Sequence, residues 1–284
     1  MIDDRAMKKP LALILGTNEI ASAVAVRMTQ AGYACILADD PHPPVIRRKM
    51  SFHDVLYYEE AILDGVAGRR ADTALELLAA LEAPAHVAVT PLHLSDLITL
   101  RTPTALIDAR MQKYRVTPDW RHIARLAVGL GPNFRVGANC DLAIETKPSQ
   151  VGALVEFGGT EPADRTPALL GGVGANRFAY AAQDGLWHSA LDIGVRVYKG
   201  LVVGHLDGAP VSAPLDGVLR GVARDGLHVP GGAKILEIDP RQRAACWTGV
   251  DPRGDAIARA VVRGVAIKRA ERSAPAPAGG GLRH

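Results

Sequence analysis

The fold of this chain is decided by the stretch Leu11-Ala12-Leu13-Ile14-Leu15-Gly16-Thr17-Asn18-Glu19. Its five apolar residues predict a buried strand, and the small polar residues after them predict a tight turn. The amphipathic segment Ile20 to Gln30 then predicts a helix. Strand, turn and helix in this order form the first half of a βαβ unit. Such a turn directs backbone N–H groups and a helix N-terminus at one point, which favours an anion.

Apolar strands and helices continue to alternate after this unit. We predict strands at 33–38, 86–90, 104–108, 125–128 and 141–146, helices at 52–60 and 72–83, and a helix or turn at 94–100. This alternation is typical of a parallel sheet with helices on its faces. The fold class is therefore α/β, with a Rossmann-like parallel-sheet domain over residues 1–150.

The region from Val151 to residue 243 has short strands, many glycines and little helical periodicity. Two halves repeat one pattern, the first from Asp184-Gly185 and the second from Asp216-Gly217. This duplication resembles the barrel-sandwich fold of biotinyl and lipoyl carrier domains, so we predict a small all-β barrel-sandwich domain over 151–243. The hairpin between the halves, Asp207 to Val211, contains no lysine, which argues against an attached biotin or lipoyl arm.

The C-terminal region separates into two parts. Ile257, Val261 and Val265 recur at helical spacing, so we predict that residues 244–268 include a helix that packs back on the core. Residues 269–284 are rich in Pro, Ala and Gly, and we predict that they are disordered.

The bulk composition excludes several classes of protein. With 284 residues, of which 48% are hydrophobic and 22% charged, the chain is globular. A net charge of +3 is too small to indicate nucleic-acid binding. No apolar run reaches the roughly 20 residues of a membrane span, so no membrane contact is expected. The three widely spaced cysteines argue against a metal site or a disulfide framework and favour the cytoplasm.

The first turn is the core of the candidate ligand site. The G-x-G-x-x-G pattern of dinucleotide-binding turns is represented here by Gly16, Asn18 and Ala21. Asn18 would crowd a pyrophosphate and Glu19 would repel it, so the pattern supports the fold better than it supports NAD binding. Asp39, about 20 residues further on, either binds a ribose hydroxyl or is an ordinary loop carboxylate.

Nearby loops add further candidates. Arg47 and Arg48 either close over an anion with their planar guanidinium groups or form a basic surface loop. Asp108 and Arg110 follow a strand at the edge where parallel sheets bind ligands, or they form a structural ion pair. Glycines after the strand at 125–128 expose backbone N–H groups. The predicted ligand-binding residues are Gly16, Thr17, Asn18, Asp39, Arg47, Arg48, Asp108, Arg110, Gly129 and Gly131, and no catalytic residue is assigned.

Several fragments occur together in an order that points to one family. They are Val45 to Phe52, Asp108 to Met111, Gly129 to Phe134, Ile144 to Thr146, Gly217 to Gly221 and Asp239 to Arg241. In these fragments the chain resembles the YqeB family of accessory proteins from selenium-dependent molybdenum hydroxylase systems, whose Rossmann part is distantly similar to XdhC-type maturation factors. The family's first turn is glycine-rich, whereas this chain has Gly16-Thr17-Asn18-Glu19.

The resemblance implies an accessory or maturation factor that handles or inserts the molybdenum cofactor of a hydroxylase. Its small phosphate-bearing ligand would be molybdopterin or a nucleotide, and its partners a client molybdoenzyme and a second copy of the chain. Two alternatives stay open. One is a nicotinamide-dependent oxidoreductase, although the scattered histidines identify no proton donor. The other is a non-catalytic partner-binding or scaffold protein with a degenerate nucleotide site.

Overall fold

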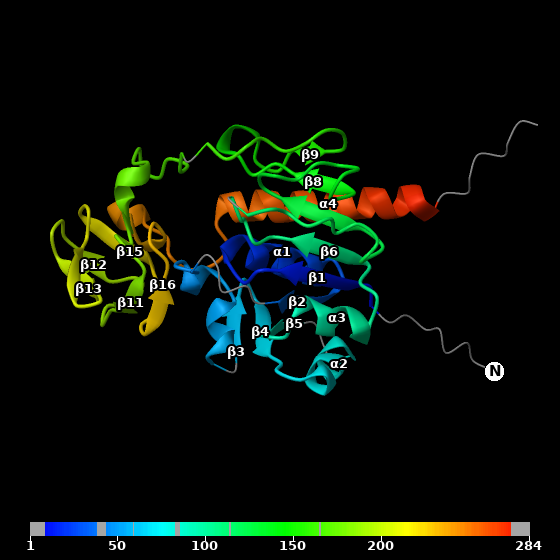
Figure 1. Ribbon diagram of the computed structural model, residues 1–284, viewed down its shortest axis with the longest axis horizontal. Coiled ribbons are helices and arrows are strands. Elements are labelled where there is room, and N and C mark those ends of the chain that lie inside the picture. Colours follow the sequence, from blue (N-terminus) through cyan, green and yellow to red (C-terminus); the bar gives the residue numbers. More distant parts are fainter. Residues whose placement is uncertain are drawn as a thin grey trace, which may run out of the picture.

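The computed structural model describes residues 9–38, 44–58, 60–82, 86–113, 115–164 and 166–273, and it has a mixed α/β fold (Figure 1). Nine strands form one sheet in the order β3-β4-β5-β2-β1-β6-β7-β8-β9. In this spatial order, the seven strands that run from β4 through β1 to β8 are parallel to one another. The two edge strands, β3 and β9, are antiparallel to their neighbours. The strands are β1 (Leu11–Leu15), β2 (Ala34–Ala38), β3 (Glu60–Leu63), β4 (Val66–Arg70), β5 (His86–Thr90), β6 (Ala105–Asp108), β7 (Ala127–Leu130), β8 (Leu142–Ile144) and β9 (Leu154–Val155).

Helices cover both faces of this sheet because the central strands are apolar on both sides. Ala12 and Ile14 of β1 pack against α1 (Glu19–Gln30) and α4 (Pro252–Ser273). Leu11, Leu13 and Leu15 point the other way, toward α2 (Ala74–Glu82) and α3 (Leu94–Leu100). The prediction of a parallel sheet buried on both faces is confirmed, and we call this part the parallel-sheet unit.

Small residues let α4 lie close to α1 and to the sheet. A Cβ on Gly264 would stand 2.5 Å from Leu142, and one on Gly254 would stand 3.3 Å from Ala23 of α1. Arg27 of α1 also forms an ion pair with Asp255 of α4 at 2.6 Å. A helix from the far end of the sequence therefore completes the core of the first unit, as the apolar spacing predicts.

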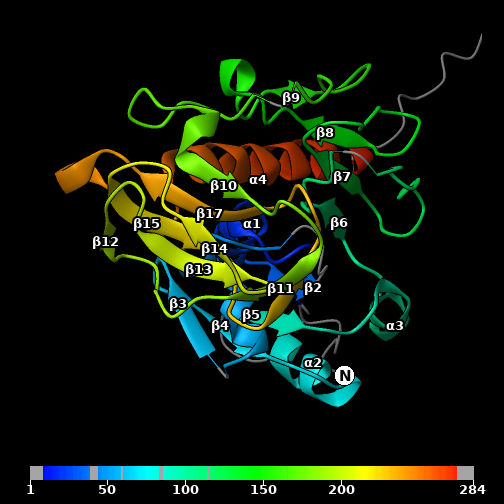
Figure 2. The ribbon, with the colours of Figure 1, turned by 60° about the vertical axis from the view of Figure 1, so that its left-hand side comes forward.

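Two four-stranded antiparallel sheets, β10-β17-β15-β12 and β14-β13-β11-β16, form the second part, which we call the antiparallel unit (Figure 2). Its two halves begin with the same contact: Asp184 accepts a hydrogen bond from the Gly231 amide and Asp216 accepts one from the Lys199 amide, both at 2.7 Å. The strands are β10 (Phe178–Tyr180), β11 (Gly185–His188), β12 (Arg196–Val197), β13 (Val202–Leu206), β14 (Ala209–Ser212), β15 (Gly217–Val222), β16 (Leu227–Val229) and β17 (Lys234–Asp239).

An extended segment of the first unit fixes the antiparallel unit in place. The carbonyl of Ile46 accepts a hydrogen bond from the Val222 amide at 2.9 Å. Gly221 permits this approach, because a Cβ there would stand 3.0 Å from the same carbonyl oxygen. Arg48 adds a hydrogen bond from its Nε to the Val222 carbonyl at 3.1 Å. The antiparallel unit therefore sits at the carboxyl edge of the parallel strands.

Three boundaries differ from the prediction. The predicted helix at 52–60 is wrong: 3-10 turns at 48–50 and 53–56 lead into the hairpin of β3 and β4. The Phe52 ring determines this, because it is fully buried over Gly68, where a Cβ would stand 2.4 Å away. The first sheet continues to β9, beyond residue 150, and α4 continues to Ser273, so residues 269–273 of the predicted tail are helical. Residues 274–284 lie outside the described residues.

No helix in the described part of the chain is both long and apolar enough to span a lipid bilayer.

Candidate functional site

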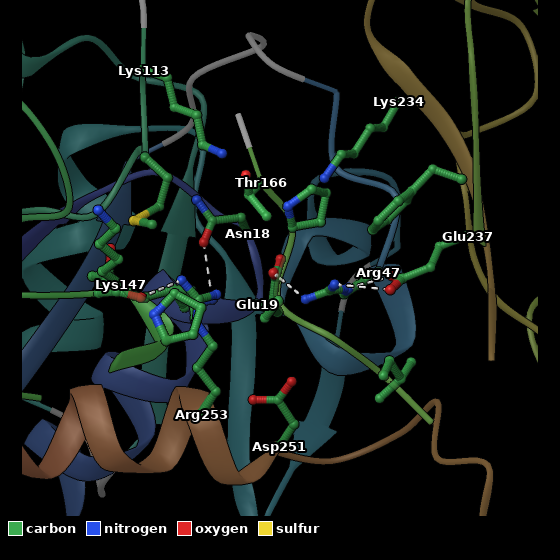
Figure 3. Close-up of a pocket in the computed structure, with 18 of the residues that line it drawn as sticks. Asn18, Glu19, Arg47, Lys113, Lys147, Thr166, Lys234, Glu237, Asp251 and Arg253 are labelled. Atoms are coloured by element: carbon green, nitrogen blue, oxygen red, sulfur yellow. Dashed lines mark hydrogen bonds and ion pairs between the residues drawn. The ribbon is translucent and has the colours of Figure 1, made fainter. Parts of the chain in front are cut away.

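A cavity of about 700 Å³ lies where the two units meet (Figure 3). Its walls come from the segments that follow β1, β6, β7 and β8, from strand β17 and from the first turn of α4. Since these segments follow the carboxyl ends of parallel strands, the cavity occupies the edge where open α/β sheets bind ligands.

Three cations in the cavity come from three separate parts of the structure. Lys113 follows β6, Lys234 begins β17 and Arg253 lies in the first turn of α4. Figure 3 shows the ammonium groups of Lys113 and Lys234 directed toward the same space, with Arg253 reaching up from α4. Within the described residues, none of the three forms an ion pair with a carboxylate.

The cations Lys113, Lys234 and Arg253 have hydrogen-bond donors that their contacts in the described structure do not use. Arg253 donates from Nη2 to the Thr146 carbonyl at 2.9 Å, and its Nε is buried with no hydrogen-bond partner in the described structure. The Lys234 ammonium lies 3.8 Å from the centre of the Phe178 ring. A buried donor without a partner is costly, so an acceptor that entered the cavity would gain this interaction.

The electrostatics of the cavity are positive around Lys234. Burial, with the positive charges of Lys113 and Arg47, lowers the pKa of Lys234 to about 8, and Glu237 opposes the shift. Burial likewise lowers the pKa of Arg253. Burial is the main cause of both shifts, and neighbouring positive charges add to it. A buried, positively charged surface of this kind attracts an anion.

A second group of charged side chains lines the same cavity, and its members pair with one another. The buried Glu237 carboxylate accepts hydrogen bonds from Nε of Arg47 at 2.6 Å and from Nε of Arg177 at 2.8 Å. Arg47 also pairs with Glu19 of α1 at 2.8 Å. Burial would raise the pKa of Glu237, but Arg47, Arg177 and Arg220 together hold it below its ordinary value. This network joins the two units.

The first turn uses its own polar groups internally. Gly16 has a φ of +101°, and a Cβ there would stand 3.2 Å from Cα of Arg110. The buried Thr17 hydroxyl lies 2.8 Å from Nδ1 of His53. The side chain of Asn18 accepts hydrogen bonds from the first amides of α1 and donates to the Ala109 carbonyl at 2.8 Å. The amides that we expected to hold an anion are therefore occupied by Asn18.

Three more of the predicted residues, Arg48, Asp108 and Arg110, have structural partners. Arg48 pairs with Asp54 at 2.7 Å and does not line the cavity. Asp108 pairs with Arg110 at 2.6 Å and accepts a hydrogen bond from Nε1 of Trp120 at 2.8 Å. The structural alternative for the Asp108–Arg110 pair is therefore observed, although Arg110 also lines the cavity.

The glycines predicted for the site have steric roles. A Cβ on Gly129 would stand 2.0 Å from the Phe134 ring, and Gly131 has a φ of +85°. Among the ten predicted residues, the structure brings Asn18, Arg47 and Arg110 into the lining of the cavity. Asp39 lies outside the described residues.

The sequence prediction missed Lys113, Lys234 and Arg253. The position of Lys113, shortly after a strand at the carboxyl edge, is a signal that could have identified it. The other two come from distant segments that only the docking of the antiparallel unit and of α4 brings together. Among the described residues, no group of three or more His, Cys, Asp or Glu side chains is placed to hold a metal ion.

Comparisons with known proteins find sequence similarity but no informative structural likeness. No known family model matches the chain. Two structures of the ectoine utilization protein EutE (DoeB) from Ruegeria pomeroyi, without ligand and with bound product, are 12% and 11% identical to it, with TM-scores of 0.26 and 0.25. They cover 81% of this chain, which in turn covers 86% and 85% of theirs, and TM-scores this low support no structural inference.

A protein of Escherichia coli K12, uncharacterized protein YqeB, is 31% identical to this chain over 254 residues. The matched region covers 89% of this chain and 46% of YqeB, so the chain spans about half the length of this relative. Over nearly its whole length, the chain is therefore similar in sequence to one part of YqeB.

Proposed function

We propose that the chain binds a small phosphate-bearing ligand in the cavity between its two units. The observation that carries this proposal is the set of three cations, Lys113, Lys234 and Arg253, that face the cavity without a carboxylate partner among the described residues. Phosphate oxygens would accept the unused donors, since charge-assisted hydrogen bonds to phosphate are strong. A volume of about 700 Å³ is suited to a ligand of nucleotide or pterin size.

The strand order supports a Rossmann-type assignment for the first unit. The segment β5-β2-β1-β6-β7-β8 has the order 3-2-1-4-5-6 that this fold uses. Ligands of such sheets bind where the order reverses, here between β1 and β6, and Asn18 and Arg110 follow these two strands. The two four-stranded sheets and the repeated Asp contacts support a barrel-sandwich assignment for the second unit.

The similarity to YqeB supports membership of that family. From the resemblance of the sequence fragments, we further propose a role as accessory or maturation factor for a molybdenum hydroxylase in the cytoplasm. In this proposal the ligand is molybdopterin or its nucleotide form, which the chain would bind in order to deliver it to the client enzyme. The antiparallel unit would contact the client enzyme. A nicotinamide-dependent oxidoreductase has less support, because the described lining of the cavity contains no histidine, the commonest proton donor of enzymes.

The experiment is a thermal-unfolding screen against AMP, CTP, NAD(H), NADP(H) and molybdopterin forms. A ligand at 100 times its Kd should add about 2.7 kcal/mol to the free energy of unfolding. The double variant Lys113→Ala with Lys234→Ala should lose this stabilisation, and the exposed control Lys199→Ala should keep it. A shift that the double variant retains in full would place the ligand elsewhere and overturn the proposal.

A further inference from the structure

A basic hollow of about 640 Å³ lies at the opposite, amino-terminal edge of the parallel strands. It is formed by residues just before β1, β6 and β7 and by the last turns of α4. Figure 1 shows α4 running from the antiparallel unit to this edge, where β1 begins. A helix of 22 residues is about 33 Å long, so the hollow is remote from the cavity described above.

The described lining of this hollow contains five cations and no carboxylate. They are Arg101, Arg125, Lys268, Arg269 and Arg272. Cations in the last turn of a helix stabilise its negative end, which accounts for those on α4. That effect does not account for Arg101 and Arg125, which come from the loops before β6 and β7.

The carboxylates that pair with two of these cations lie outside the lining of the hollow. Arg272 pairs with Asp141 at 3.1 Å, and Lys268 pairs with Glu271 at 3.0 Å, but neither carboxylate lines the hollow. The side chain of Arg125 has no ion pair or hydrogen bond to the described residues. Charges that converge from several elements on one concave surface focus the field on it.

The other side chains of the hollow narrow the class of ligand. Its apolar residues are Pro10 and the buried Leu126, so it lacks the apolar core of a protein interface. Its described lining contains no aromatic side chain on which the bases of a single strand would stack. We propose that this hollow binds a compact soluble oligoanion that carries several phosphate groups, held by the forked guanidinium groups of its arginines.

The test is calorimetric titration with sodium tripolyphosphate. The titration uses the full chain with Lys113→Ala and Lys234→Ala, so that the first cavity contributes little and the two proposals can fail separately. We expect one saturable site in this background. Adding Arg125→Ala and Arg272→Ala should weaken it at least about tenfold, the effect of losing charge-assisted hydrogen bonds. The matched control Arg263→Ala, an exposed residue of the same helix, should change it less than about twofold.

Arg125→Ala alone is the variant least expected to disturb folding, because the exposed Arg125 side chain forms no hydrogen bond or ion pair with the described residues. It should weaken tripolyphosphate binding while thermal unfolding stays unchanged. Equal losses in Arg125→Ala and Arg263→Ala would mean that only the overall charge matters and would overturn the proposal. The absence of saturable binding would overturn it as well.

Discussion

Two groups of charges line the same cavity and differ in what satisfies them. Around Glu237, each charge has a partner: Arg47 and Arg177 donate to its carboxylate at 2.6 Å and 2.8 Å. Around the open space, Lys234 and Arg253 have no carboxylate partner in the described structure. A charged side chain in a cavity therefore does not by itself indicate ligand binding. The closed group, Glu237 with Arg47 and Arg177, holds the two units together. The open group, Lys113, Lys234 and Arg253, is available to a ligand.

The largest effect that this comparison predicts is on stability. Glu237→Gln should lower the free energy of unfolding by about 3–5 kcal/mol, because it leaves buried arginines without their counter-charge. Urea denaturation measures this change. The exposed Glu161, which pairs with Lys147 at 3.3 Å, is the control, and its change to Gln should have little effect. Equal stability of Glu237→Gln and wild type would remove the distinction between the two groups.

The pH dependence of stability gives a second test of the pairing around Glu237. Arg47, Arg177 and Arg220 hold the pKa of Glu237 below its ordinary value despite burial. A lowered carboxyl pKa stabilises the fold above the unfolded value of about 4.3, and this contribution is lost as the pH falls through the lower folded value. Acid titration of wild type should therefore show a loss that Glu237→Gln lacks.

Substitutions in the open group should affect ligand affinity strongly and stability little. Arg253→Met should weaken AMP binding by about 10–150-fold, which corresponds to the 1.5–3 kcal/mol of a hydrogen bond to a charged group. The free energy of unfolding of the Arg253→Met variant should not fall by more than about 1 kcal/mol, because the substitution also removes the buried Nε that has no hydrogen-bond partner. Calorimetry and urea denaturation test the two parts, with Arg263→Met on the same helix as control. A large loss of stability with unchanged affinity would assign Arg253 to the closed group.

The affinity for AMP should also depend on pH through Lys234. Burial lowers the pKa of Lys234 to about 8; the positive charges of Lys113, Arg47 and Arg177 act in the same direction, and Glu237 opposes them. At pH 9 only about one tenth of the free protein carries this proton, so AMP should bind about tenfold more weakly than at pH 7. The AMP phosphate is already ionised over this range, because its second pKa is about 6. Lys234→Arg should bind equally well at both pH values, and a parallel decline in that variant would contradict the assignment.

The smallest effect concerns the first turn. Asn18→Ala should lower the unfolding free energy by about 1 kcal/mol, because it removes the N-cap of α1. Asn18→Asp keeps an acceptor at this position and should keep the cap. AMP affinity should be unchanged or higher in Asn18→Ala, since two amides of α1 become free. A strong loss of AMP affinity in Asn18→Ala would indicate that the turn after β1 itself binds the ligand.

The sequence predicted those features that local patterns determine. The apolar run Leu11 to Leu15, the repeat of Asp184 and Asp216, and the spacing of the C-terminal helix each depend on residues close together in the chain. The helix at 52–60 failed because tertiary packing of Phe52 overrides local preference there. The open group of cations could not be predicted, because three segments far apart in the sequence meet only when α4 and the antiparallel unit have docked.

The most direct test of this ligand site is calorimetric titration of AMP at pH 7.5 into wild type and into the variant with Lys113→Ala and Lys234→Ala. We expect one saturable site in wild type and an affinity at least about tenfold lower in the variant, with unfolding temperatures within a few degrees of each other. Binding that survives both substitutions at full strength would contradict the claim that the unpaired cations of this cavity form the site.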